Sequence, residues 1–105
     1  MYYELIDDFK SWLVKEKGLS KKVASDIVSR CKRLDNDILD SIDNSVESID
    51  NYMIALEIIK KYAACNSFSI KGQYALSSSL RSAMRKYCEF RKPSEITRYP
   101  NGYNL

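Results

Sequence analysis

Apolar residues that recur every three or four positions constrain the fold of this chain more than any other feature. The clearest stripe consists of Leu76, Leu80, Ala83, Tyr87 and Phe90, with spacings of 4, 3, 4 and 3. Such spacing puts all of them on one face of a helix, and the alternation typical of strands is almost absent from the sequence. The sequence therefore predicts an all-α fold, a small bundle of four to five helices.

Local signals divide the chain into helical segments. Gly18 is expected to close the first helix in the left-handed conformation, Ser20 to cap the second, and Pro93 to forbid continuation of the last. The predicted helices span about residues 3–17, 21–34, 46 or 49 to 65, and 69–91. Residues 35–45 are rich in Asp, Asn and Ser and predict a loop with one short turn. We expect one domain, with a bundle at 1–92 and an irregular C-terminal tail at 93–105.

The helical stripes also predict the core. Trp12 is expected to lie in the core rather than to anchor a partner, and Cys31, Cys65 and Cys88 to be buried free thiols. The other predicted core residues outside the last helix are Leu5, Ile6, Phe9, Leu13, Val23, Ala24, Ile27, Val28, Leu34, Ile49, Met53, Leu56, Ile59 and Ala63. With no CxxC pair and no histidine, a zinc site is not expected.

Charge is separated along the chain, although the formal net charge is only +3. Residues 1–33 carry eight bases and five acids, residues 34–59 carry seven acids and no base, and residues 60–105 carry nine bases and two acids. Such separation creates a strong local field of each sign, and a cationic face attracts polyanions such as nucleic acid. The pattern favours binding over catalysis.

Several classes of function are disfavoured by what the sequence lacks. Without histidine, a Gly-rich phosphate loop, or a Ser or Cys beside a plausible base, we expect no enzyme and no cofactor. A calcium loop counted from Asp35 would need Gly at its sixth position and Glu at its twelfth, where Asp40 and Val46 stand, so no metal is expected. The acidic, amphipathic N-terminus predicts neither a signal peptide nor a membrane span, and we expect a cytoplasmic protein.

One family resemblance is visible. The stretch FKSWLVKEKGLSKKVASDIVSRCKRL (Phe9 to Leu34) and, after an acidic gap, LRSAMRKYCEF (Leu80 to Phe90) resemble the SAM-like core-binding domain of phage integrases and other tyrosine recombinases. The shared pattern is a first helix ending in an aromatic-Leu pair and a Gly-Leu-Ser turn, a second helix, and a final helix with an Arg-rich face. It covers about residues 1–92. Where the family commonly has Thr and an aromatic residue, this chain has Val23 and Ile27.

The resemblance implies a DNA-clamp module that carries out no recombination by itself, since the chain ends 13 residues after Lys92 and the catalytic domain of the family is missing. It implies DNA contacts at the start of the second helix and on the basic side of the last. Cations near helix ends and along a helix face also suit phosphate binding on physical grounds. The predicted nucleic-acid-binding residues, with double-stranded DNA as partner, are Lys21, Lys22, Arg30, Arg33, Arg81, Arg85 and Lys86.

Other interpretations of the same residues stay open at this point. The basic side chains could be the solvated faces of amphipathic helices, and the terminal tyrosines could fold back onto the bundle. Alternatively, the chain could be a small phage or mobile-element interaction protein, an inhibitor or adaptor that docks on a basic nucleic-acid-binding protein. The predicted partner-binding residues are then Asp35, Asp37, Asp40, Asp43, Tyr99 and Tyr103. We expect a monomer, because so short a chain needs its stripes for its own core.

Overall fold

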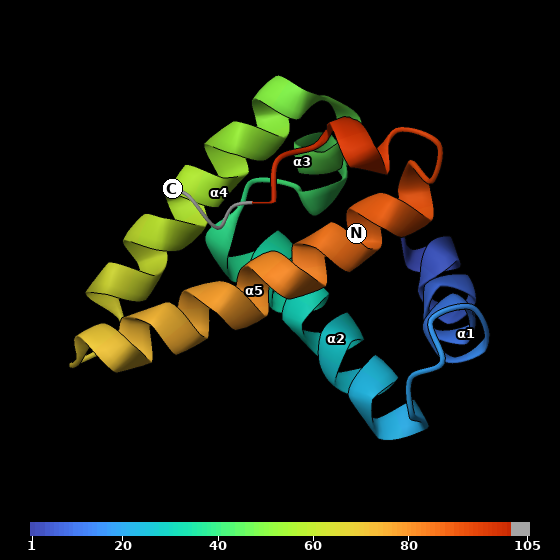
Figure 1. Cartoon of the computed structure of the whole chain (residues 1–105), viewed down its shortest axis with the longest axis horizontal. Helices are drawn as coiled ribbons and strands as arrows, with labels where there is room; N and C mark the ends of the chain where they lie inside the picture. Colours follow the sequence, from blue (N-terminus) through green and yellow to red (C-terminus); the bar gives the residue numbers. More distant parts are fainter. Residues whose placement is uncertain (102–105) are drawn as a thin grey trace.

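The computed structural model describes residues 1–101, in which helices are the only regular secondary structure (Figure 1). The α-helices are α1 (Ile6–Lys15), α2 (Lys21–Arg33), α3 (Ile42–Glu47), α4 (Ile49–Cys65) and α5 (Ile70–Arg91). Three further elements are the 3-10 turns η1 (Tyr3–Leu5) and η3 (Ile96–Arg98) and the π-helical turn η2 (Leu34–Ile38). The predicted all-α class is confirmed.

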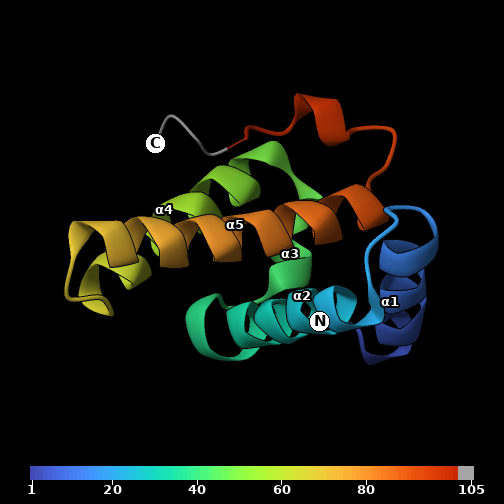
Figure 2. The same cartoon turned by 60° about the horizontal axis from the view of Figure 1, so that its bottom comes forward.

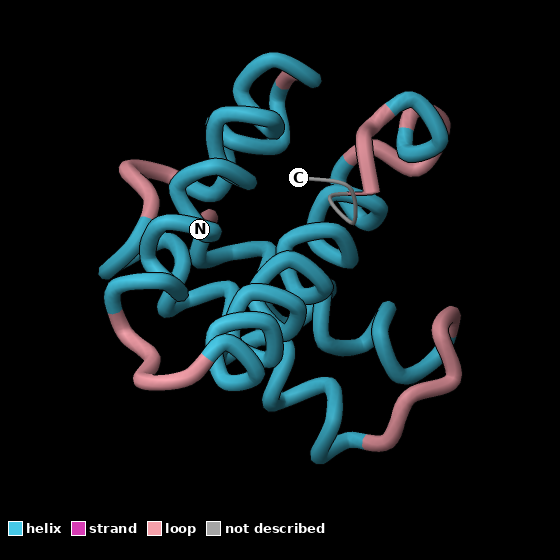
Figure 3. The backbone as a smooth tube through the Cα atoms, turned by 60° about the vertical axis from the view of Figure 1, so that its left-hand side comes forward, coloured by secondary structure: helices cyan, strands magenta, loops and turns pink. Residues whose placement is uncertain are grey.

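The long helix α5 organises the bundle. It runs across the molecule with α2 crossing it on one side and α4 folding back beside it, while α1 closes the end near the C-terminus of α5 (Figures 1 and 2). Short loops join the helices (Figure 3). The turn between α4 and α5 lies at one end of the molecule, away from α1, so the hairpin projects from the body.

Serine side chains set where the helices begin. Ser20, Ser41, Ser48 and Ser69 are the N-caps of α2, α3, α4 and α5, and each hydroxyl oxygen accepts a hydrogen bond of 3.0–3.2 Å from the backbone N–H three residues later. This bond satisfies one of the amides that a helix start leaves without a partner. Gly18, which follows α1, has φ +69°, the predicted left-handed conformation, and Ser20 is the predicted N-cap of α2. Both predictions are confirmed.

The core forms where α5 packs against α4, α2 and α1, and where α1 packs against α2. Phe9 of α1 packs edge-on against Tyr87 of α5, with ring centroids 5.2 Å apart. Cys31 of α2 donates a hydrogen bond to the Ala83 carbonyl of α5 at 3.4 Å. The residues buried at these contacts include Leu13, Ala24, Ile27, Val28, Leu34, Leu56, Ile59, Leu80, Met84 and Cys88. Most of the predicted core is confirmed.

Four predicted core residues are exposed, and five others are only half-buried: Leu5, Ile6, Trp12, Leu76 and Phe90. Val23, Ile49, Met53 and Cys65 all lie on the surface, which corrects the prediction for each. The error has one cause: periodicity identifies an apolar face, but not how much of it a neighbouring helix covers. On α4 the covered side is narrow and centres on Tyr52, Leu56 and Ile59, so apolar side chains flanking it remain in solvent.

The segment predicted as a loop, 35–45, is largely helical. It contains most of η2 and the first part of α3, so the prediction of a loop was wrong. Its polar side chains form hydrogen bonds with the backbone amides at the start of α3 and so stabilise the helix. The Asp35 carboxylate accepts a hydrogen bond of 3.0 Å from the backbone N–H of Ile42, and Ser41 is the N-cap. Burial of Leu39, Ile42 and Val46 then stabilises the segment.

The described part of the C-terminal segment, predicted as an irregular tail, is packed on the bundle. Tyr99 is buried, lies edge-on against Tyr52 with centroids 5.2 Å apart, and donates a hydrogen bond of 2.7 Å to the Val46 carbonyl. The terminal tyrosine thus folds back as a core residue, which corrects its predicted role in binding a partner. Tyr103 lies outside the described residues.

Candidate nucleic-acid interface

The structure gathers several predicted cations in one open cleft on the outward face of α5. The cleft encloses about 210 Å³ between α5, the turn after α1 and the C-terminal segment. Its lining residues are Lys17, Ser78, Arg81, Ser82, Arg85, Lys86, Glu89 and Asn101. Three of the seven predicted nucleic-acid-binding residues therefore converge, together with a lysine that sequence reasoning did not select.

Helical spacing explains the composition of this cleft. Ser78, Ser82, Arg85 and Glu89 follow one another at intervals of 4, 3 and 4 on α5, on the side opposite the buried stripe. The small serine side chains project little from the helix and present hydroxyl groups to the cleft. A second molecule can approach the helix closely between the cationic side chains.

Lys17 reaches the cleft because of the turn that follows α1. The Leu19 amide donates to the Leu13 carbonyl at 3.2 Å, which bends the chain back toward the bundle. The Lys17 ammonium then lies 2.9 Å from the Glu89 carboxylate and 5.7 Å from the centre of the Trp12 ring. The ion pair is partly exposed to solvent, where such pairs stabilise weakly and exchange partners readily.

Arg85, one of the predicted nucleic-acid-binding residues, has a structural task in the bundle. Its guanidinium donates to the carbonyl oxygens of Ile96, Tyr99 and Pro100 at 3.0–3.2 Å. These bonds fasten the C-terminal segment across α5. Its charge still contributes to the field of the cleft, but its donors are directed inward.

The other two cations that α5 contributes to the cleft, Arg81 and Lys86, also make hydrogen bonds within the helix. The Arg81 Nε donates to the Ser77 carbonyl at 3.2 Å, and the Lys86 ammonium donates to the Ser82 hydroxyl at 3.2 Å. Both are short-range bonds within the helix. A lysine ammonium carries three donors, so the bond to Ser82 leaves Lys86 with capacity for an anion.

The four predicted cations of α2 do not join the cleft. Lys21 and Lys22 are exposed at the start of the helix, where Lys21 lines a separate hollow with Asp7 of α1. Arg30 is exposed. Arg33 lies over the ring of Tyr62 on α4, 5.4 Å from its centre, and donates to its hydroxyl.

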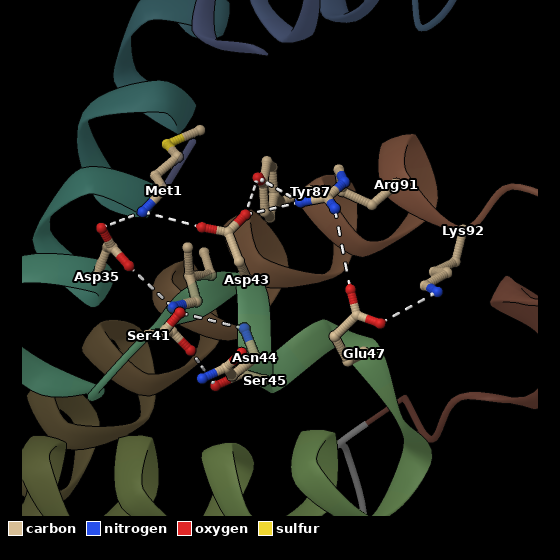
Figure 4. A network of polar contacts seen from close by, with 11 residues as sticks. Met1, Asp35, Ser41, Asp43, Asn44, Ser45, Glu47, Tyr87, Arg91 and Lys92 are labelled. Carbon is tan, nitrogen blue, oxygen red and sulfur yellow. Dashed lines mark hydrogen bonds and ion pairs between the residues drawn. The ribbon is translucent and has the colours of Figure 1, made fainter. Parts of the chain in front are cut away.

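Two of the predicted partner-binding acids belong to an internal polar network instead of the surface (Figure 4). Asp43 is buried, accepts hydrogen bonds from Tyr87 and from Arg91 at 2.7 Å, and lies 3.0 Å from the Met1 ammonium. Asp35 is half-buried and forms an ion pair with the same ammonium. Both acids are committed to interactions within the chain, so their predicted role as a docking surface is wrong.

The network changes the ionisation of its members. Burial lowers the pKa of the Met1 ammonium, but hydrogen bonds and charge from Asp35 and Asp43 outweigh it, and the pKa is raised overall. Burial, reinforced by the bond to Asp43, raises the pKa of the Tyr87 phenol. Sequence reasoning missed this cluster because Asp43 and Arg91 are 48 positions apart and neither lies in a motif.

The remaining predicted acids, Asp37 and Asp40, are exposed, and Asp40 lines a shallow groove between α3 and α4. Burial raises the pKa of both the Cys31 and the Cys88 thiol, the latter to about 12, so neither becomes a thiolate near neutral pH. Within residues 1–101 there is no group of acids and cysteines that could hold a metal ion. Across the same residues, no helix is both long and apolar enough to cross a membrane.

Comparisons with protein-family models, with curated proteins and with solved structures each found no match to this chain.

Proposed function

We propose that this protein is a non-catalytic DNA-binding module that contacts the phosphate backbone through the cleft on α5. The observation that carries the proposal is the convergence of Lys17, Arg81 and Lys86 on one surface that also presents serine hydroxyls. Cations neutralise phosphates and release their counterions, and hydroxyl groups add hydrogen bonds to phosphate oxygens.

Two further points support this proposal. The cleft has four lining cations, Lys17, Arg81, Arg85 and Lys86, and a single lining acid, Glu89. The field at the cleft is therefore more positive than the net charge suggests. The resemblance to recombinase core-binding domains also implies DNA contacts on the basic side of the last helix, where Arg81 and Lys86 lie.

The exposed cations at the start of α2 have a lesser part in the proposal. Lys21 follows Lys17 by four positions but lines a different hollow. It can contact a duplex only if the DNA extends from the cleft around the turn after α1. Substitution of Lys21 and Lys22 is therefore expected to weaken binding less than substitution within the cleft.

A fluorescence-anisotropy titration with labelled duplex DNA tests the proposal. The informative variant is Arg81→Ala/Lys86→Ala, which removes two cleft cations and leaves the Arg85 clamp intact. The matched control is Lys60→Ala/Lys71→Ala, which removes two exposed cations from outside the cleft and changes net charge equally. The cleft variant should lose most of the affinity, whereas the control should stay close to wild type.

Salt dependence provides the second readout. With three phosphates contacted, a fourfold rise in monovalent salt should weaken binding about 40-fold. The absence of binding at low salt would overturn the proposal. An equal loss of affinity in the two double variants would show that net charge, and not the cleft, attracts the DNA.

A further inference from the structure

The outward face of α4 carries apolar side chains that no part of the described chain covers. Ile54 is 60% exposed and Ile58 is 38% exposed. Asp50 precedes Ile54 by four positions, and Lys61 follows Ile58 by three, so these four residues form one stripe along the helix. The stripe lies opposite the buried residues of α4, such as Leu56.

A shallow groove borders this stripe. It encloses about 200 Å³ between α4 and the segment containing η2 and α3. Its lining residues are Leu39, Asp40, Ser41, Asn44, Ser45, Asn51, Ile54, Ala55 and Ile58. The stripe and the groove together form a continuous surface with an apolar centre and a polar margin, which is the usual anatomy of a protein interface.

The charge of this surface changes sign along α4. Of the seven acids in residues 34–59, Asp40 lines the groove and Asp50 lies on the stripe, whereas Asp35 and Asp43 are paired inside the bundle. Residues 60–88, which supply the last turn of α4, the hairpin turn and most of α5, contain six bases and no acid. Phe68 and Ile70 at the hairpin turn are also almost completely exposed. One end of the surface is therefore acidic and the other is cationic and apolar.

We propose that a second copy of this chain occupies this surface, with the two α4 helices packed antiparallel about a two-fold axis near residue 56. That register puts Ile54 against Ile58 of the other copy and brings Asp50 within reach of the other Lys61. Every such contact occurs twice, as two-fold symmetry requires. A parallel arrangement would instead put acidic ends together and basic ends together.

The same register gives the hairpin turn a place to bind. With a rise of 1.5 Å per residue, the end of α4 lies about 14 Å from the two-fold axis. At a similar distance on the other copy lies the start of α4, where Asn51 donates to the Asn44 carbonyl at 3.1 Å beside the groove. Phe68 and Ile70 of one copy thus reach the groove of the other, which Leu39 and Ala55 help to line. This dimer rests on different residues from the proposed DNA contacts.

Charge reversal on purified full-length protein tests the dimer. Sedimentation velocity over a wide concentration range should show a monomer–dimer equilibrium for the wild type, in the micromolar range for so small a surface. Asp50→Lys alone and Lys61→Glu alone each create two like-charge contacts and should weaken the dimer about tenfold. The double variant Asp50→Lys/Lys61→Glu should restore it, because the opposite charges face each other again.

Ile54→Lys should abolish the dimer without unfolding the chain, since the side chain is already in solvent; circular dichroism checks the fold. Tyr3→Lys, an equally drastic change at an exposed site away from α4, is the control and should leave the dimer intact. A monomer at every concentration overturns the proposal. So does a double charge variant that dimerises more weakly than either single variant, because that result excludes the antiparallel register.

Discussion

At the scale of single residues, the structure depends on a few polar groups that satisfy one another inside the bundle. Asp43 is the centre of the largest group, with Tyr87, Arg91 and the Met1 ammonium around it (Figure 4). A buried carboxylate is costly unless it is paired and hydrogen-bonded. Each donor to Asp43 therefore stabilises the fold more than an exposed pair would.

Removal of one donor to Asp43 should show this directly. Tyr87→Phe keeps the ring in the core but takes a hydrogen bond from a buried carboxylate, and should lower the free energy of unfolding by about 1–3 kcal/mol. Tyr74→Phe is the control, because the Tyr74 side chain is 65% exposed and loses no buried hydrogen bond when its hydroxyl is removed. Urea denaturation should find little change for the control. Equal losses in the two variants would contradict the account.

Alkaline pH should weaken the same network. The pKa of the Met1 ammonium is raised in the folded chain, so the folded state holds this proton more tightly than the unfolded state. Stability from this group is complete below the unfolded pKa of about 8 and is lost as the pH rises through the folded value. The raised pKa values of Tyr87 and Cys88 act in the same direction at higher pH.

Thermal denaturation at stepwise increasing pH measures this effect. The melting temperature should fall from about pH 8 upward. Asp35→Asn keeps an oxygen that can accept the Ile42 amide but removes one charge facing Met1, so it should flatten the alkaline decline. A decline as steep as that of the wild type would show that the ammonium is not its source.

At the scale of secondary-structure elements, the helix signals in the sequence were strong where they combined a cap with a long stripe. Ser20 and Ser69 mark the starts of α2 and α5, and Gly18, after α1, has the left-handed conformation that was predicted. The prediction failed for η2 and α3 because their Asp, Asn and Ser content is typical of loops. Only burial of Ile42 and Val46 by the rest of the bundle decides for a helix.

The C-terminal segment depends on Arg85 in a way that the sequence could not reveal. An arginine on the polar side of a helix looks like a surface cation until a later segment places three carbonyl groups around it. Arg85→Ala removes those donors and should release residues 93–101 from the bundle. Hydrogen exchange at η3 and near Tyr99 should then be faster than in the wild type, while exchange in α5 should change little.

Lys71→Ala is the control for this measurement, since Lys71 is an exposed cation of the same helix that lies at its other end, far from the clamp. Its exchange pattern at residues 93–101 should remain close to wild type. Unchanged exchange in Arg85→Ala would contradict the clamp. A binding experiment that substitutes Arg85 therefore mixes loss of charge with loss of structure.

At the scale of the whole molecule, charge separation was readable from the sequence but its arrangement was not. The grouping of Arg81, Arg85 and Lys86 could be predicted because helical spacing places them close together on α5, and they do share a cleft. Lys17 was missed because only the turn after α1 carries it there. Asp43 and Tyr99 were assigned to the surface because a single sequence does not show which distant segment will bury a polar residue.

The central claim is that phosphates bind in the α5 cleft, and the salt slope of DNA binding tests it most directly. The slope of log affinity against log salt should fall in magnitude by about 0.9 in Lys86→Ala relative to the wild type, because one phosphate contact is lost. Lys71→Ala, outside the cleft, should leave the slope unchanged. A Lys86→Ala slope equal to that of the wild type would contradict the claim.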